Sequence, residues 1–305
     1  MILQVDKPMW NPVPSPCMLL SLSFTVFQLV FAKYHFNTSE TSSSANVLAL
    51  LTWKASLESE SQLLLSSWMN TSSSPCHWDC IRCDNLGRMT EMNKSNYLIK
   101  GTLHHLDFSS FSYLVKIDFS INSLYDTLPT NIFNLSKLSY FDLGFNDFSG
   151  TIPPEIRFLK SIKYLWLDHT RLSGVLPQEF GMLESLFLLR IQATNLTGTI
   201  PVSIGNLCRL SLLYLDENKF SGHIPQEIAM LSSLKGLFPS RNTFIGSILT
   251  SFGDLTNLES LYLHTNTVSG CIPQGIWSLT HLMDVDLGNN NFAGQIPSPI
   301  GNFSK

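Results

Sequence analysis

Apolar and polar residues alternate in a pattern that repeats every 24 residues from Leu114 to Lys305. This stretch divides into eight copies without insertion or deletion, and the clearest copy, LSLLYLDENKFSGHIPQEIAMLSS, spans residues 210–233. Positions 1, 4, 6, 11, 15, 19 and 22 of every copy are aliphatic or aromatic, with Pro239 as the one exception. Such a period predicts a solenoid in which each copy forms one coil and neighbouring coils bury each other's apolar side.

Three polar or special positions recur in most copies and predict how the backbone turns. Asn at position 9 can satisfy backbone groups that lose their partners where the chain leaves a strand. Thr170 and Thr194 replace this Asn in two copies and can do part of that work. Gly at position 13 suits a bend with positive φ, and Pro at position 16 fixes φ after a short second strand. We expect Pro239 to disrupt the sheet locally, because it removes a donor from a buried ladder. The alternative is that the solenoid tolerates it, because nearest-neighbour stability lets the stack absorb one weak coil.

The segment before the repeats predicts a cap for the first coil. Apolar residues at helical spacing indicate a helix over residues 46–65, with Asn46 as its N-cap. The motif CHWDCIRCDNLGRMTEM follows at residues 76–92, and residues 89–113 form a degenerate 25-residue first repeat. We therefore assign residues 46–88 to the cap and residues 114–305 to eight regular repeats with no C-terminal cap.

These motifs resemble those of plant leucine-rich-repeat (LRR) receptor-like kinases. The resemblance rests on ALLTWKASL, on the cysteine motif and on the GxIP signature of the repeats, and it covers residues 47–305. The stretch GTLHHLDFSSF, residues 101–111, is most similar to the male-discoverer-interacting group of these receptors. The resemblance implies an α/β LRR solenoid with a curved parallel sheet on the concave face, short second strands, and 3-10 or short helices on the convex face. It also implies a helical cap closed by a disulfide between Cys76 and Cys83.

Two residues, one in the cap and one in the degenerate first repeat, depart from the family pattern. Cys80 stands where the family usually has Gly, and Lys94 stands where an inner Leu is expected. The spacing C-x3-C-x2-C with His77 leaves a metal site as an alternative, although the family needs neither a metal nor another cofactor.

The concave strands carry the residues that could bind a ligand. Positions 5, 7 and 8 should point outward between buried positions 4 and 6, on strands stacked about 4.8 Å apart. Position 5 forms a column of aromatic residues with one Arg, and such residues often dominate binding. Aromatic and Asp residues are also frequent at position 5 of this repeat class in coils that bind nothing. We expect an extended peptide in this groove, with Arg190 or Arg241 facing a carboxylate. The candidate ligand-binding residues are Tyr140, Asp142, Tyr164, Trp166, Asp168, Arg190, Gln192, Tyr214, Asp216, Phe238, Arg241, Tyr262 and His264.

The N-terminal residues indicate the secretory pathway. Residues 18–32 are mostly apolar, too short and too polar for a confident membrane span. Residues 1–36 therefore read as a signal peptide region or an uncleaved signal anchor, and residues 37–45 as a polar linker. We expect the protein outside the cell or on the outer face of the plasma membrane. Candidate N-glycosylation sequons lie at Asn37, Asn70, Asn93, Asn134, Asn195 and Asn302.

Charge and motif content narrow the function. Only 14% of residues are charged, the net charge is −4, and we find no basic stripe, so nucleic acid is not an expected partner. The chain contains no phosphate-binding Gly-rich loop and no kinase HRD or DFG motif, which argues against an enzyme. The resemblance implies a recognition module for a peptide or an LRR co-receptor kinase. The alternatives are a soluble wall protein similar to polygalacturonase inhibitors, a decoy, or part of a receptor gene whose kinase lies beyond Lys305. Without a cap, the last repeat could also mediate association.

Overall fold

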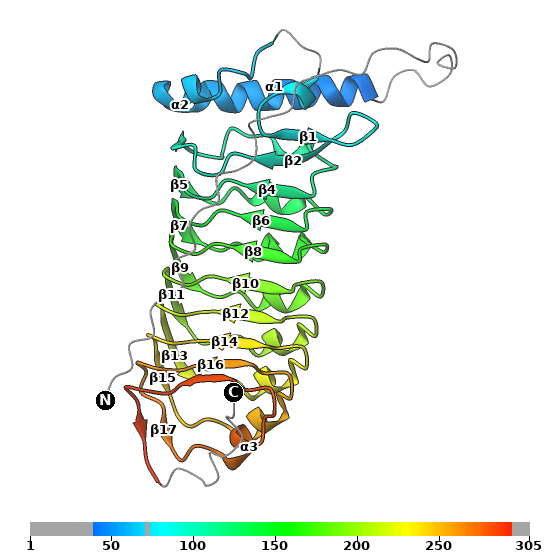
Figure 1. The fold of residues 1–305 in the computed structure, drawn as a ribbon. Coiled ribbons are helices and arrows are strands. Elements are labelled where there is room, and N and C mark those ends of the chain that lie inside the picture. The colour runs from blue at the N-terminus through cyan, green and yellow to red at the C-terminus, as the bar shows by residue number, and fades with distance from the viewer. Residues whose placement is uncertain (1–38, 71–73, 295–305) are drawn as a thin grey trace. The chain divides into compact units, whose positions relative to one another are not determined.

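The computed structural model describes residues 39–70 and 74–294. In this part of the chain the coils stack side by side, and each one contributes a short strand to a ten-stranded sheet (Figure 1). The pairing is parallel throughout except between the first two strands. The strands are, in spatial order, β1 (Ile81–Cys83), β2 (Met89–Asn93), β4 (Lys116–Asp118), β6 (Tyr140–Asp142), β8 (Tyr164–Trp166), β10 (Leu188–Arg190), β12 (Leu212–Tyr214), β14 (Gly236–Phe238), β16 (Ser260–Tyr262) and β18 (Asp284–Asp286).

A second series of strands follows the predicted turn of each coil. Seven of them form one sheet: β3 (Lys100–Gly101), β5 (Ser123–Thr127), β7 (Asp147–Thr151), β9 (Arg171–Val175), β11 (Asn195–Gly198), β13 (Lys219–His223) and β15 (Thr243–Ile245). Two more, β17 (Ser269–Gly270) and β19 (Asn291–Phe292), pair separately. The predicted solenoid with two sets of strands is confirmed.

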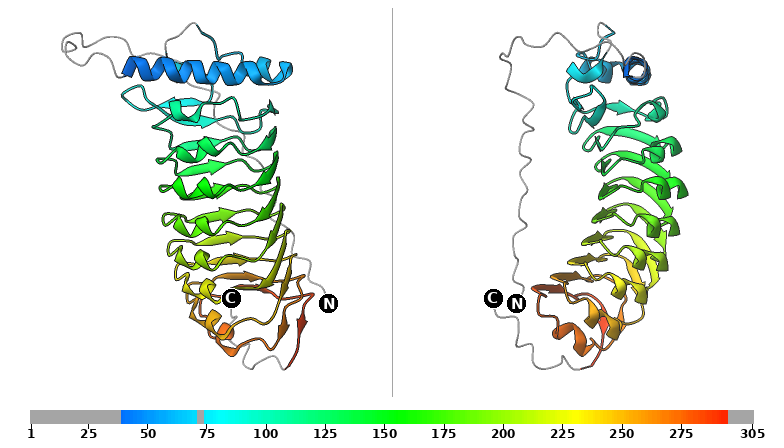
Figure 2. Two further views of the ribbon diagram at one scale, coloured as in Figure 1. Left: turned by 180° about the vertical axis from the view of Figure 1, so that it is seen from behind. Right: turned by 90° about the vertical axis from the view of Figure 1, so that its right-hand side faces the viewer.

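Each coil closes on the side away from the ten-stranded sheet. Short 3-10 helices stack there, and the sheet lines the inner side of the curve (Figure 2, right). These are η2 (Phe108–Ser110), η3 (Thr130–Asn134), η4 (Pro154–Phe158), η5 (Gln178–Met182), η6 (Val202–Asn206), η7 (Gln226–Met230) and η8 (Thr250–Asp254), followed by the short α-helix α3 (Gln274–Trp277). The apolar positions of the repeat fill the space between the layers. Leu165, Leu189 and Leu213, for example, are fully buried.

The cap differs from the prediction at its start. The expected helix over 46–65 is two helices, α1 (Ser39–Ser56) and α2 (Ser59–Leu64), separated at Leu57 and Glu58. Asn46 is therefore not an N-cap but a buried residue inside α1. Most of the 37–45 segment, which we expected to be a linker, is helical from Ser39. The signal or anchor region, residues 1–36, lies outside the described residues.

The cap is fixed by a disulfide and by stacked indoles. Cys76, in η1 (Pro75–His77), and Cys83, in β1, form the expected disulfide. It removes two of the three cysteine thiolates that the alternative metal site would need. Trp68 lies between two other indoles, with its ring centroid 6.0 Å from that of Trp53 and 5.6 Å from that of Trp78. Trp53 in turn stacks on Phe119 of the first regular coil, at 5.4 Å. The cap thus covers the apolar end of the solenoid with aromatic surface.

The two residues that depart from the family pattern, Cys80 and Lys94, lie close to one tyrosine. Cys80 has φ 64°, a left-handed conformation that explains why a glycine suits this position. The Cys80 sulfur lies 3.0 Å from the Tyr97 hydroxyl. Lys94 is fully buried, and its ammonium lies 4.2 Å from the Tyr97 ring centroid and 5.5 Å from that of Trp68. Lys94 can take the place of an inner leucine because its aliphatic chain is buried like a leucine side chain and its ammonium lies over the faces of two aromatic rings.

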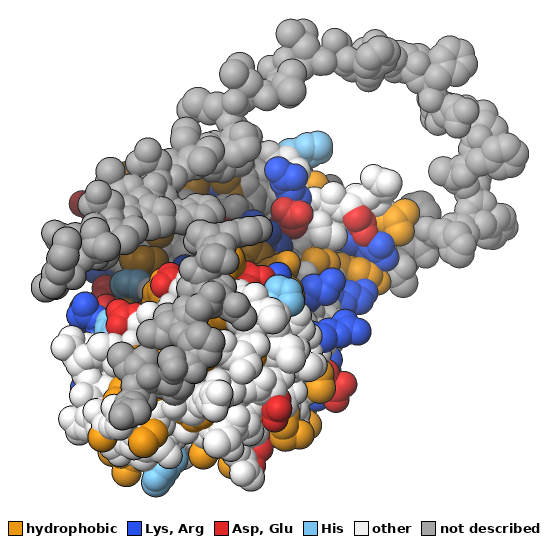
Figure 3. All heavy atoms as spheres, turned by 60° about the horizontal axis from the view of Figure 1, so that its bottom comes forward, with side chains coloured by type: hydrophobic (Ala, Val, Ile, Leu, Met, Phe, Trp, Pro, Cys, Tyr) orange, Lys and Arg blue, Asp and Glu red, His pale blue; other side chains and the backbone are white. Residues whose placement is uncertain are grey.

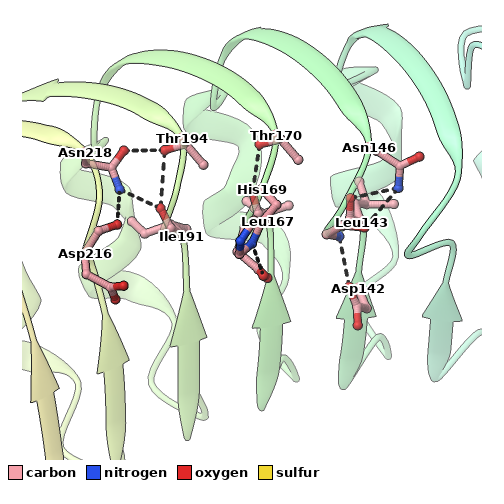
Figure 4. Close-up of polar contacts among 12 residues, drawn as sticks. Asp142, Leu143, Asn146, Leu167, His169, Thr170, Ile191, Thr194, Asp216 and Asn218 are labelled. Carbon is pink, nitrogen blue, oxygen red and sulfur yellow. Dashed lines mark hydrogen bonds and ion pairs between the residues drawn. The ribbon is translucent and has the colours of Figure 1, made fainter. Parts of the chain in front are cut away.

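The position 9 side chains form a polar ladder behind the strands (Figure 4). The Asn218 amide nitrogen donates to the carbonyls of Ile191, Leu215 and Asp216, and its oxygen accepts from the amide of Leu196. Asn122, Asn146, Asn242, Asn266 and Asn290 repeat this arrangement. Thr170 donates only one bond, from its hydroxyl to the carbonyl of Leu167, as expected for a partial substitute.

Pro239 disturbs the sheet less than expected. In the neighbouring coils the position 6 amide donates to the position 5 carbonyl of the next coil, as Leu215 does to Phe238 at 2.9 Å. Pro239 cannot make that bond to Tyr262, and the β14–β16 pairing has two residue pairs where β12–β14 has three. The amide of Arg241 still donates to the carbonyl of His264. Pro239 therefore costs the ladder one hydrogen bond, and the sheet continues through β16 and β18.

Candidate functional site

The candidate residues at positions 3 and 5 share the concave face of the sheet. Their strands pair in register, so that Asp142 lies beside Trp166, Trp166 beside Arg190, and Arg190 beside Tyr214. The column continues through Phe238 on β14 and Tyr262 on β16. Trp166 and Tyr214 are half-buried and point away from the core. The residues that precede them, Leu165 and Leu213, point into the core. The position 3 and position 5 side chains therefore lie on the predicted concave face.

The aromatic residues form two clusters rather than one continuous ladder. On β6 and β8, the ring centroid of Trp166 lies 4.6 Å from that of Tyr140 and 5.7 Å from that of Tyr164. On β12, β14 and β16, the Phe238 ring stacks on Tyr214 at 4.4 Å and meets the edge of Tyr262 at 5.2 Å. We call these the first and second aromatic clusters. A ligand that lies along the sheet would contact two aromatic surfaces, with a polar segment on β10 between them.

Arg190 lies in that polar segment. Its guanidinium carbon lies 4.5 Å from the centroid of the Tyr214 ring, a distance typical of a cation–π contact. Among the described residues, no carboxylate oxygen lies within ion-pair distance of Arg190. The buried Nε has no hydrogen-bond partner in the part of the chain that the structure describes. Arg190 therefore lies over an aromatic ring and makes no ion pair with any of the described residues.

The second arginine candidate is different. Arg241 lies at position 8, and its Nε is 3.8 Å from a carboxylate oxygen of Glu217 on the preceding coil. Both side chains are more than half exposed to solvent. An exposed pair of this kind contributes little to stability, but it places a negative charge beside the guanidinium. Of the two candidates for a carboxylate partner, the structure favours Arg190.

Two carboxylates close to Arg190 are shifted toward their neutral form. Burial raises the pKa of Asp142 to about 7, and the neighbouring charge of Asp118 adds to the shift. Burial likewise raises the pKa of Asp216 to about 6. Arg190 acts in the opposite direction on both groups, as a nearby cation should. The centre of the concave face therefore changes its charge near neutral pH.

The alternation rule treated position 8 as a continuation of the strand. In the structure the backbone turns at this position instead. Phe145, His169, Ala193 and Arg241 all have φ between 50° and 55°, in the left-handed region. Their amides still continue the ladder, because each donates to the position 7 carbonyl of the next coil, as Phe145 does to Asp168 at 2.9 Å. The turn also stacks the rings of Phe145 and His169, whose centroids are 4.0 Å apart.

The remaining candidates at position 7 lie along one edge of the column. Asp168 is almost completely buried, and its carboxylate lies 3.0 Å from Nδ1 of His169. Gln192 follows on the next coil, and His264 contacts the hydroxyl of Thr265. Asp168 is thus a poor direct contact for a ligand, whereas Gln192 and His264 remain accessible.

The structure adds residues that the candidate set omitted. Lys116 on β4 lies with its ammonium 4.3 Å from the Tyr140 ring centroid, and Phe187 packs edge-on against Tyr164 at 5.8 Å. Asp284 on β18 accepts a hydrogen bond from the Tyr262 hydroxyl. Burial, and after it this hydrogen bond, raises the pKa of Tyr262 to about 12. Positions 2 and 3 of the repeat could have indicated these residues, since they flank the position 5 column.

Lys and Arg side chains gather along one edge of the molecule (Figure 3). Lys137, Lys160 and Lys163 are exposed residues in the turns that precede β6 and β8. The cations come from separate coils, so the linear sequence does not show them as a run.

The described sequons lie on different faces. Asn134 is exposed at the end of η3, Asn195 is exposed at the start of β11, and Asn93 ends β2 on the concave side. Asn70 is exposed in a turn after α2. Asn37 and Asn302 lie outside the described residues.

Comparison with known families agrees with this architecture. Residues 154–268 match the family described as "Leucine-rich repeat region", and residues 137–159 and 281–303 match "Leucine Rich Repeat". Residues 43–84 match "Leucine rich repeat N-terminal domain". The chain is a leucine-rich-repeat protein. The N-terminal domain match covers the disulfide cap up to the residue after Cys83.

The curated relatives of this LRR protein are plant receptor-like kinases. A probable leucine-rich repeat receptor-like protein kinase of Arabidopsis thaliana is 38% identical over 121 residues, which is 38% of this chain and 10% of the relative. The MDIS1-interacting receptor like kinase 2 of the same plant is 40% identical over 106 residues, 34% of this chain and 10% of the relative. The predicted resemblance to this group is confirmed. The chain spans about a tenth of the length of the curated relatives that it matches.

Solved structures of plant receptor ectodomains have the same fold. The LRR ectodomain of the Arabidopsis thaliana receptor kinase GASSHO1/SCHENGEN3, in complex with CASPARIAN STRIP INTEGRITY FACTOR 2, superposes with a TM-score of 0.81 and 29% identity. The match covers 85% of this chain and 31% of that one. The Arabidopsis receptor kinase HAESA, in complex with the peptide hormone IDA and the co-receptor SERK1, gives 0.76 and 31% identity over 85% of this chain and 44% of that one.

No helix among the described residues is long and apolar enough to cross a membrane. The family matches lie in the cap and the repeats, and none of them is a catalytic domain.

Proposed function

We propose that this chain is the non-catalytic, extracellular recognition region of a plant LRR receptor, and that it binds an extended peptide along the concave face. The observation that carries the proposal is the central column of β8, β10 and β12, where Arg190 lies between two aromatic clusters and forms no ion pair within the described part of the chain. Large aromatic residues and arginine often supply most of the energy of binding.

The column matches the chemistry of a peptide. Strand-to-strand spacing of about 4.8 Å spreads the two aromatic clusters over several coils, which suits a linear chain better than a compact small molecule. The aromatic surfaces can take apolar side chains, and Arg190 can take a carboxylate through paired hydrogen bonds. Support also comes from the HAESA structure, in which a similar solenoid holds a peptide hormone together with a co-receptor.

A direct test is selection from a displayed library of linear peptides on the purified chain, followed by calorimetry with the selected peptides. Replacement of Trp166, Arg190 and Tyr214 by alanine should abolish binding. The matched control is alanine at Phe158, Met182 and Met230, three exposed residues of the 3-10 layer, and it should bind normally. Equal affinity for the two triple variants would contradict the groove.

The same experiment separates the alternative. A protein similar to polygalacturonase inhibitors would select no linear peptide but would inhibit a fungal polygalacturonase. We favour the peptide because the central column is aromatic and half-buried, whereas recognition of a folded enzyme needs a broad exposed surface.

A further inference from the structure

The sequon asparagine Asn93 lies in the same column as the proposed ligand-binding residues. It is the last residue of β2, and its register partner on β4 is Asp118. Asp118 in turn pairs with Asp142, which is followed by Trp166 and Arg190. The buried neighbour Met92 pairs with Ile117, so Asn93 points to the concave side.

The Asn93 side chain is available for modification, unlike the asparagines of the position 9 ladder. Asn122, for example, uses its amide nitrogen to donate to the carbonyls of Lys94, Phe119 and Ser120. Asn93 uses only its oxygen, which accepts from the amide of Ser95 at 3.1 Å. Among the described residues its amide nitrogen donates no hydrogen bond, and the side chain is partly exposed. The nitrogen that would carry a glycan is therefore not used by the fold.

We propose that an N-glycan on Asn93 borders the concave face at its cap end and shields β4, so that a ligand can use the column only from β6 onward. This inference rests on the proposed function, because glycosylation requires the secretory pathway. A glycan on Asn134 would instead project from the 3-10 layer, and one on Asn195 from the second sheet. Only Asn93 among the described sequons lies on the concave face.

Lys116 offers a local reporter for this glycan. Lys116 lies on β4, where its register partner is Glu91. It is two residues before Asp118, the register partner of Asn93, and its side chain is 30% exposed. Lys235, which precedes β14 and is 53% exposed, lies several coils away. A glycan on Asn93 should slow acetylation of Lys116 and leave Lys235 unaffected.

The matched variants are Ser95→Ala, which destroys the sequon, and Ser95→Thr, which keeps it. Each would be secreted from plant cells, with site occupancy and lysine acetylation rates measured by mass spectrometry. We expect Asn93 to be occupied in the natural protein and in Ser95→Thr. Lys116 should react several-fold faster in Ser95→Ala, or after enzymatic removal of glycans, while Lys235 does not change.

Three results would overturn the inference. The first is an unmodified Asn93 in a protein that carries a glycan on Asn134 or Asn195, which would leave the proposed function intact. The second is an occupied Asn93 with no change in Lys116 reactivity between the two Ser95 variants. The third is the absence of glycans from all of these sites in the secreted protein, which would overturn the inference and leave peptide binding to its own test.

Discussion

The guanidinium of Arg190 lies over the ring of Tyr214, with 4.5 Å between the guanidinium carbon and the ring centroid. Arg190 thus lies on the concave face, on a strand between the coil of Asp142 and the coil of Asp216. Both carboxylates respond to it, since Arg190 opposes the rise in their pKa. The charge of the groove therefore depends on the protonation of these two side chains.

We predict that a selected peptide bearing a carboxylate binds more tightly as pH falls from about 7 toward about 5. Protonation of Asp142 (pKa about 7) and Asp216 (pKa about 6) removes negative charge beside Arg190, while a peptide carboxylate stays ionised. Calorimetry across this range checks the trend. In the double variant Asp142→Asn, Asp216→Asn the affinity should not change with pH, and a persistent pH dependence would show that other groups control it.

Asp142→Asn should stabilise the protein at pH 8 and have little effect at pH 4. Because the folded-state pKa of Asp142 is raised from 3.8 to about 7, its contribution is present at low pH and is lost as pH rises through that window. A shift of this size corresponds to at most about 4 kcal/mol, so we expect a gain on the order of 2 kcal/mol at pH 8. Asparagine keeps the acceptor for the Gly144 amide, now 2.9 Å away.

Urea denaturation of the variant and the natural protein at both pH values measures the difference. Asp147→Asn is the control, since Asp147 is an exposed residue paired with Arg171 and has no comparable burial. A stability difference that is the same at pH 4 and pH 8 would contradict the assigned pKa.

Pro239→Leu should stabilise the sixth coil by about 1 kcal/mol, because it supplies the missing amide donor to the Tyr262 carbonyl. Leucine occupies the same position in the preceding and following coils, as Leu215 and Leu263. Denaturant unfolding measures the gain. The reverse change Leu215→Pro should destabilise the chain by about 1 kcal/mol for the lost hydrogen bond, and further because it removes a fully buried leucine side chain. A neutral Pro239→Leu would show that the lost bond has no energetic weight.

Asn218→Ala should destabilise the chain by more than Thr170→Ala. Asn218 satisfies three carbonyls and one amide in a buried position, whereas Thr170 donates a single bond. Each buried group left without a partner costs about 1–3 kcal/mol. Thermal unfolding of the two variants ranks them, and an equal loss would mean that water replaces the amide in this ladder.

Asp126→Gly should stabilise the chain by about 1 kcal/mol, because a non-glycine residue in the left-handed region costs roughly that amount. Asp126 takes position 13 in the first regular coil with φ 76°, where Gly150 has φ 77° in the next. The ion pair lost to His104 is long, at 3.7 Å, and exposed. Differential scanning calorimetry tests this, with Gly150→Ala expected to destabilise, since its Cβ would lie 2.8 Å from Thr127.

The repeat period by itself determined the solenoid, its buried positions and its turns. Each coil contacts mainly its neighbours, so a local pattern repeated every 24 residues is enough to specify the interior at Leu165 or Leu213 and the positive φ at Gly150. It also placed Trp166, Arg190 and Tyr214 on one face, because alternation along a strand decides which side a residue occupies.

Only the tertiary structure decided how side chains from different coils interact. The pairing of Arg241 with Glu217, the stacking of Arg190 on Tyr214 and the burial that shifts Asp142 all depend on side-chain conformations across strands. The starts of the cap helices and the small effect of Pro239 likewise depend on packing and on bonds between coils. The one-dimensional period contains no information on these contacts, since it fixes which residues are neighbours but not how their side chains share the space between them.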